Sequence, residues 1–243
     1  MREVNISQLW GRAWDLFKVN WLLLVGLLVI AIIVSLISFI SALIAEILLW
    51  LALIGALIPG ILLWAALVRA GYLVARQGQS SFGEAFRDLS SLLKIFVYEL
   101  TLLLILRNLP RMAHLGWWAS DILVVADFII LFLSFFVWAA PYYVLSGRAG
   151  IFSAIGQSFS LTWRNFSKVF VALLSFIGLL ILGLLLLRLG FLWDVPILTL
   201  GGVLLCGLWL LVVGPMAFVF WPLLYLALTD EEGVSHSKSL RLG

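Results

Sequence analysis

The stretch VFVALLSFIGLLILGLLLL, at residues 169–187, decides the fold class, because it carries no charged residue over about the length that crosses a lipid bilayer as a helix. Similar apolar runs recur along the 243 residues, of which 65% are hydrophobic, and the mean hydropathy is +1.21. Lipid offers no partners to backbone N–H and C=O groups, so such long, Leu-rich runs predict helices. We therefore expect an all-α integral membrane protein.

Apolar continuity and the placement of charges predict about six transmembrane helices, arranged as three hairpins, at residues 20–45, 47–75, 93–109, 120–146, 166–188 and 195–229. An even number of spans puts both termini on one side. That side receives twelve of the fifteen Lys and Arg residues, and only Arg107, Arg111 and Arg188 lie on the other. The positive-inside rule then predicts a multi-pass protein of the inner (cytoplasmic) membrane with both termini in the cytoplasm.

Three amphipathic segments precede the odd-numbered spans, and their apolar residues recur at helical spacing. The first segment begins near Ile6. The second follows Ser81 and Glu84, whose spacing is that of a capping box, and runs toward Phe96 as one helix. The third begins near Ile151. We expect each segment to form an interfacial helix that lies among the lipid headgroups.

These segments suggest a weak threefold repeat, in which each unit is an interfacial helix followed by a transmembrane hairpin. An aromatic residue recurs at Trp14, Phe86 and Phe159, and an Asn precedes an aromatic residue at both Asn20 and Asn165. We expect a single membrane domain and a polar cytoplasmic tail. The domain covers residues 1–229, its repeats 6–76, 81–146 and 150–229, and the tail 230–243.

Three polar motifs carry a family resemblance: WGRAWDLFKVNW at residues 10–21, RQGQSSFGEAF at 76–86 and AIGQSFSLTWRNF at 154–166. Over roughly residues 6–230 the chain resembles the six-helix family named after the membrane domain of glycerophosphodiester phosphodiesterases, with its YciC-like relatives. The resemblance implies a non-catalytic membrane module. We expect no counterpart here of the soluble barrel that sometimes accompanies this module, since a polar tail follows Asp230.

Ionisable residues inside a membrane are the usual candidates for function. Glu99 falls inside the third predicted span and Asp127 inside the fourth, while Arg107 approaches Asp127 from the outer end. A proton or ion site is one interpretation of these carboxylates. A structural ion pair between Asp127 and Arg107 or Arg111 is the favoured one, because no chain of polar partners leads to either carboxylate.

The sequence shows no pattern of a catalytic, metal or cofactor site. The chain has two His residues and one Cys, and no nucleophile–base pair or phosphate-binding loop is apparent. We therefore predict no enzymatic activity and no metal or cofactor, although lipid or pigment could contact the deeper tryptophans Trp64, Trp138 and Trp209, for which packing is favoured. The isoelectric point near 9.2 reflects membrane topology and does not indicate nucleic acid.

Small residues on the last predicted helix, namely Gly201, Gly202, Cys206 and Gly214, would allow close contact with another helix, either within the bundle or from a partner. By elimination we predict a non-enzymatic scaffold or accessory subunit that binds other integral membrane subunits and lipids. A transporter or lipid-handling protein is the alternative, and it requires a continuous polar path. A pigment-binding photosynthetic accessory subunit is a further alternative.

Overall fold

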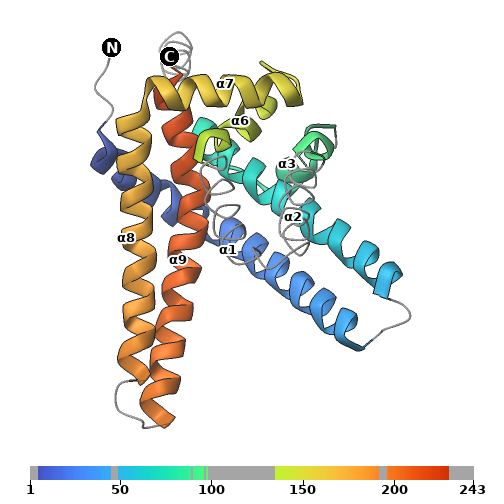
Figure 1. Cartoon of the computed structure of the whole chain (residues 1–243), viewed down its shortest axis with the longest axis vertical. Helices are drawn as coiled ribbons and strands as arrows, with labels where there is room; N and C mark the ends of the chain where they lie inside the picture. The colour runs from blue at the N-terminus through green and yellow to red at the C-terminus, as the bar shows by residue number, and fades with distance from the viewer. Residues whose placement is uncertain are drawn as a thin grey trace, which may run out of the picture. The chain divides into compact units, whose positions relative to one another are not determined.

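The computed structural model describes residues 5–44, 49–88, 90–95, 97, 135–191 and 196–229. Every regular element in these ranges is a helix (Figure 1). The helices are α1 (Ile6–Ile44), α2 (Leu49–Gln77), α3 (Phe82–Phe86), α6 (Ala140–Leu145), α7 (Ile151–Arg164), α8 (Phe166–Phe191) and α9 (Pro196–Leu228). The predicted all-α class is confirmed.

Four helical stretches among the described residues are long and apolar enough to cross a membrane, at Ile6–Val34, Pro59–Gln77, Phe166–Arg188 and Thr199–Leu228. Helices α8 and α9 agree with the last two predicted spans to within a few residues. The predicted spans 93–109 and 120–146 fall mainly outside the described residues. The chain is thus a membrane protein by the length and composition of its helices, and a total of six spans stays a prediction.

The chain divides into two compact units. The α8–α9 unit contains residues 1–33, 70–85 and 165–243, and so combines the first part of α1 and the end of α2 with α8 and α9. The α6–α7 unit contains residues 34–69 and 86–164. Each unit has its own buried side chains, and each is described by itself below.

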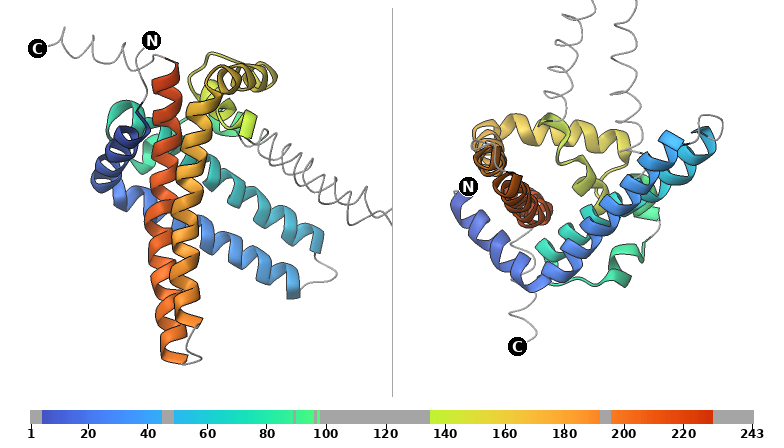
Figure 2. Two further views of the ribbon diagram at one scale, coloured as in Figure 1. Left: turned by 60° about the vertical axis from the view of Figure 1, so that its left-hand side comes forward. Right: turned by 90° about the horizontal axis from the view of Figure 1, so that it is seen from below.

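In the α8–α9 unit, α8 and α9 pack side by side and run in opposite directions (Figures 1 and 2). The first part of α1 contributes a stripe of buried residues at helical spacing, which confirms the apolar face predicted for this segment. Its buried side chains are Leu9, Ala13, Phe17, Leu24 and Leu27, and those of the other helices in this unit include Val74, Val169, Val213, Phe220, Leu224 and Tyr225.

The first amphipathic segment is not a separate helix. It forms one helix of 39 residues with the apolar run that follows, and α1 bends along its length (Figure 2). Asn5 begins this helix, because its Oδ1 accepts the backbone N–H of Ser7 at 3.0 Å. The expectation of a separate helix is therefore wrong here, and the position of this segment at the membrane interface stays a prediction. The amphipathic face passes into the span without a break.

The second segment begins as predicted but ends early. The backbone N–H of Ser81 donates to Glu84 Oε2 at 3.0 Å, and the N–H of Glu84 donates to Ser81 Oγ at 3.3 Å, which is the reciprocal pairing of a capping box. Helix α3 nevertheless stops at Phe86. Asp88 then accepts the N–H of Ser91 at 3.2 Å and begins a new helical stretch at residues 90–95. One continuous amphipathic helix through this region was a wrong prediction.

The third segment is confirmed as a helix of its own. Helix α7 has 14 residues and is followed by a break at Asn165, after which α8 begins. Within the α6–α7 unit, α7 packs against α6 (Figure 1). A turn with Gly147 at φ 71° precedes α7, and glycine adopts such a left-handed conformation without steric cost.

Candidate functional site

The ionisable residues predicted inside the membrane, Glu99, Asp127 and Arg107, lie outside the described residues. Their proposed pairing or proton chemistry is therefore untested. The site has to be sought among the polar side chains of the two described units.

The small residues of α9 are placed in different surroundings. Gly202 and Cys206 are buried within the chain. A Cβ on Gly214 would lie 3.4 Å from Leu28 Cδ2 of α1, so this glycine belongs to internal packing. A Cβ on Gly201 would meet nothing within 4 Å. Of these four positions, Gly201 is the one that leaves room for a second helix.

Trp10 joins the first part of α1 to both α8 and α9. Its indole N–H donates to Ser175 Oγ at 2.8 Å, and its ring stacks on Phe220 with the ring centroids 3.9 Å apart and the planes 11° from parallel. The Ser175 hydroxyl in turn donates to the carbonyl of Ala172 at 2.7 Å. A residue that was predicted to lie at the membrane interface therefore acts as a helix-to-helix contact.

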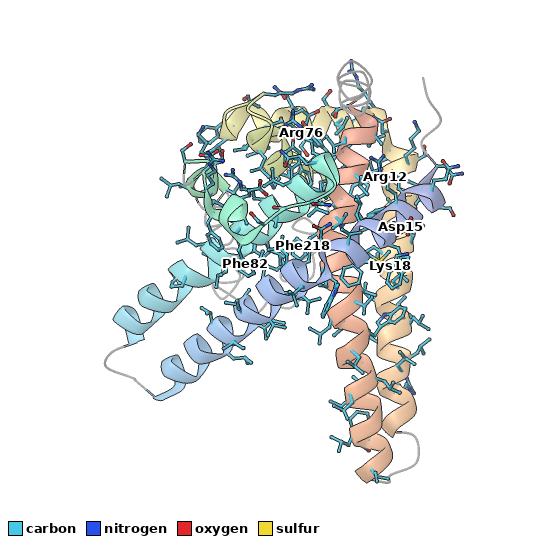
Figure 3. The ribbon with its side chains drawn as sticks, turned by 180° about the vertical axis from the view of Figure 1, so that it is seen from behind. Arg12, Asp15, Lys18, Arg76, Phe82 and Phe218 are labelled. Carbon is cyan, nitrogen blue, oxygen red and sulfur yellow. The ribbon has the colours of Figure 1, made fainter. Side chains whose placement is uncertain are left out.

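Charged side chains on this part of α1 lie on its exposed side. Lys18 Nζ is 2.8 Å from Asp15 Oδ1, and the two side chains are 53% and 71% exposed (Figure 3). The Lys18 ammonium also lies 5.9 Å from the centroid of the Trp14 ring. Such exposed pairs contribute little to stability, and they place a mixed-charge surface on this segment.

Asn20 stabilises the turn between α2 and α3 through hydrogen bonds. Its side-chain amide donates to the carbonyl of Gly78 at 3.0 Å, and its Oδ1 accepts the backbone N–H of Ser80 at 3.3 Å. Gly78 has a φ of 85°, which suits glycine. Asn20 is 6% exposed, and its amide also donates to the carbonyl of Leu16. Its polar atoms thus have a structural use within the α8–α9 unit.

The deeper tryptophans also have structural partners. Trp209 of α9 donates its indole N–H to the carbonyl of Leu179 at 2.8 Å, and its ring occupies the space beside Gly183 of α8, where a Cβ would lie 2.7 Å from Trp209 Cδ1. Trp138 donates its indole N–H to Thr162 Oγ1 at 3.0 Å. Both observations agree with packing, the interpretation favoured from the sequence over a pigment or lipid site.

A proline break in the α6–α7 unit brings polar groups together. Residues 135–137 are helical, the helix is interrupted at 138–139, and α6 resumes at Ala140 with Pro141 in its first turn. Proline lacks an N–H, and its ring crowds the carbonyl of the residue four positions earlier, so the backbone groups just before it lose their helical partners.

The hydroxyls of α7 supply the missing partners. Ser158 Oγ accepts the backbone N–H of Ala139 at 3.0 Å and donates to the carbonyl of Phe136 at 2.9 Å. Thr162 Oγ1 lies 3.5 Å from the same carbonyl. Both side chains are fully buried. Buried backbone groups without partners are costly in lipid, so these hydroxyls stabilise the break.

No sequence pattern pairs Ser158 or Thr162 with Pro141, because both are distant from it along the chain. One signal was present: Ala154, Ser158 and Thr162 recur every four residues and form a small, polar stripe on a helix. Such a stripe allows close approach to another backbone. The break resembles the discontinuous helices of transporters, but its freed groups are bound by this chain.

An ion pair in the α6–α7 unit joins Arg69, the last residue of α2 that belongs to this unit, to Asp88. Arg69 is 13% exposed, and its Nη1 lies 3.0 Å from the carbonyl oxygen of Asp88 and 3.4 Å from Asp88 Oδ2. Hydrogen bonds from the hydroxyl and then the backbone N–H of Ser91 lower the pKa of Asp88 from 3.8 to about 2. Ser90 and Arg69 lower it further, while burial acts in the opposite direction.

The polar side chains described above form hydrogen bonds and ion pairs that stabilise the fold. These side chains do not gather around an open site. Among the described residues no group of three or more His, Cys, Asp or Glu side chains is placed to hold a metal ion. No protein-family model, curated protein or solved structure matches this chain. The resemblance to the six-helix membrane-domain family therefore stays a prediction.

Proposed function

We propose that this protein is a non-enzymatic scaffold or accessory subunit that binds other integral membrane subunits. The observation that carries the proposal is the large apolar surface of α8 and α9. Side chains that are 40% or more exposed occur along α8 and on the first half of α9: Phe170, Val171, Leu174, Ile177, Ile181, Leu182, Leu184 and Leu185 on α8, and Ile197, Leu200, Val203, Leu204, Leu205, Leu208 and Leu210 on α9.

In a membrane such a surface contacts either lipid tails or the helices of another protein. Gly201 favours contact with the helices of another protein. It lies on α9 next to this surface, and a Cβ there would meet nothing within 4 Å. A second backbone approaching at Gly201 would gain close packing that lipid tails do not supply.

Gentle detergent extraction followed by native mass spectrometry tests the proposal. The native protein should retain at least one other membrane protein, and Gly201→Leu should release that partner while the isolated chain stays folded. Gly11→Leu on the exposed side of α1, away from this apolar surface, is the control, because a Cβ on Gly11 also meets nothing within 4 Å. A native protein that purifies alone and moves a solute across liposome membranes would contradict the proposal and favour a transporter.

The proposal places the chain in the inner (cytoplasmic) membrane with both termini in the cytoplasm. Basic residues support this orientation. Lys168 lies in the first turn of α8, and most other basic residues share its predicted side, including Arg76 at the end of α2. Arg188, in the last turn of α8, is at the opposite end of that helix.

A further inference from the structure

Helix α7 exposes an aromatic ridge in addition to the face that it buries. Its buried residues are Ala154, Ser158, Leu161 and Thr162. On a different side, Phe152 is 87% exposed, Trp163 is 67% exposed and Phe159 is 42% exposed. These three residues are seven and four positions apart, so at 3.6 residues per turn they form one stripe along the helix. An aromatic stripe this exposed needs a partner, since its contact with water is unfavourable.

The ridge is held in place by the packing behind it. The Phe159 ring stacks on Phe136, with the centroids 4.5 Å apart, and is nearly parallel to the Trp163 ring at 6.4 Å. Phe136 is 1% exposed and belongs to the buried part of the unit. The rings of Phe159 and Trp163 are therefore fixed relative to the core, which reduces the loss of side-chain entropy on contact with a partner.

The charges around the ridge indicate which partner it fits. Arg148 precedes α7 and Arg164 ends it, and both are exposed. No Asp or Glu occurs between Asp127 and Asp194, a stretch that includes the whole of α7. The other two amphipathic segments are different, since the first contains Asp15 and the second contains Glu84 and Asp88. Along the chain, the charged residues within α7 and closest to its two ends, Arg148, Arg164 and Lys168, are therefore all basic.

We propose that α7 is a docking surface for anionic membrane phospholipids. Phe152, Phe159 and Trp163 enter the boundary between headgroups and acyl chains, and Arg148 and Arg164 bind lipid phosphates at the two ends of the helix. Aromatic residues on one face, a polar face beside them and flanking arginines are the features that hold an amphipathic helix at an anionic interface. The proposal requires a chain embedded in a membrane, and it does not depend on a partner subunit.

The depth to which the aromatic face of α7 enters the membrane can be measured on the full-length protein in vesicles of equimolar phosphatidylcholine and phosphatidylglycerol. An environment-sensitive fluorophore is attached to Phe152→Cys or, as the matched control, to Gln157→Cys on the exposed polar face. Buried Cys206 stays in place, and the unsubstituted protein serves as the labelling blank. The fluorophore at position 152 should be shielded from the aqueous quencher acrylamide, and the one at 157 should be quenched. Equal quenching at the two positions would overturn the proposal, as would shielding that requires a co-purifying protein.

Charge selectivity is measured by native mass spectrometry of the lipids that stay bound. The ratio of bound phosphatidylglycerol to phosphatidylcholine should fall about fivefold for each arginine replaced in Arg148→Gln and Arg164→Gln, which corresponds to about 1 kcal/mol for each basic side chain at an anionic surface. The Lys variants at these positions should keep the ratio, and Arg188→Gln at the far end of α8 should leave it unchanged. A ratio that does not change in the Gln variants, or that falls equally in Arg188→Gln, would refute anionic lipid binding by α7.

Discussion

Gly71 of α2 and Phe218 of α9 meet backbone to backbone. A Cβ built on Gly71 would overlap the carbonyl oxygen of Phe218 and would lie 2.7 Å from its carbonyl carbon (Phe218 is labelled in Figure 3). Main-chain atoms cannot rotate away as a flexible side chain can. The absence of a side chain at Gly71 is therefore what allows the end of α2 to approach α9 in the α8–α9 unit.

We expect Gly71→Ala to destabilise the protein by roughly 1–3 kcal/mol, toward the upper end, because the added methyl group can fit only if one helix moves. The free energy of unfolding can be measured by titration with sodium dodecyl sulfate in mixed micelles. The same titration can measure the unfolding free energies of the Ser158 and Pro141 variants described below.

The control for this change is Gly207→Ala in α9, where a Cβ would meet nothing within 4 Å. That substitution should have little effect or be slightly stabilising, since alanine is the better helix former. Equal effects of the two substitutions would show that the close approach at Gly71 has no energetic weight.

Composition and local patterns were sufficient for part of this fold. The spans that became α8 and α9 were apparent because uninterrupted apolar runs in lipid have few other solutions. The capping box at Ser81 and Glu84 was also readable, since both of its partners lie within four residues. In contrast, the chain has 20 glycines, and no sequence pattern distinguishes Gly71 from the others, because its role depends on a residue of α9.

The polar contacts were less predictable for the same reason. Ser158 had no assigned partner, and no pattern in the sequence connected it with Pro141. The Ser158 hydroxyl lies 19 residues away in sequence from Ala139, whose backbone N–H it accepts. The third segment was predicted to be amphipathic, with one apolar face and one polar face. Helix α7 instead has three faces: one with small buried residues, one with exposed aromatic residues, and one with polar residues. A helical period defines where residues lie around the helix, but it does not define which neighbour each face meets.

Ser158 and Pro141 should be energetically coupled. Ser158→Ala leaves the N–H of Ala139 and the carbonyl of Phe136 without this hydroxyl, at a cost of roughly 1–3 kcal/mol. In a Pro141→Ala background the helix can close across residues 138–139, so the cost of Ser158→Ala should fall. The coupling measured by a double-mutant cycle should then be about 0.5–3 kcal/mol.

Ser160→Ala, on the exposed face of α7, is the control for this cycle and should show no coupling to Pro141. If the single and double substitutions at Ser158 and Pro141 are additive, Ser158 does not stabilise the proline break.

The carboxylate of Asp88 should make stability depend on pH in the acidic range. The folded-state pKa is about 2, below the ordinary value of 3.8. A group whose pKa is depressed by folding stabilises the folded state above its unfolded pKa, and this contribution is lost as pH falls toward the folded pKa. Thermal unfolding in detergent should therefore show a loss of stability between about pH 4 and pH 2, to which Asp88 contributes.

Asp88→Asn should reduce that dependence while it preserves most of the stability at neutral pH, because asparagine also caps helices. Glu84→Gln is a suitable comparison, since Glu84 is a carboxylate of the other capping motif. An unchanged acid profile in Asp88→Asn would mean that other groups account for the whole of the pH dependence.

The last prediction concerns topology, on which the proposed function depends. Single cysteines at Gln79 and Gln157 are suitable probes, because both side chains are exposed and lie in the predicted cytoplasmic connections. The neighbouring serines are poor choices, since Ser158 is fully buried and the backbone of Ser80 is bound to Asn20. A membrane-impermeant maleimide should label both cysteines only after the membrane is opened. A cysteine at Ala119, in the predicted outer connection, should be labelled in intact cells. Labelling of Gln79→Cys in intact cells would reverse the orientation derived from the basic residues. If Gln79→Cys and Gln157→Cys were labelled from opposite sides, the number of spans between them would be odd, and the six-span arrangement would be wrong.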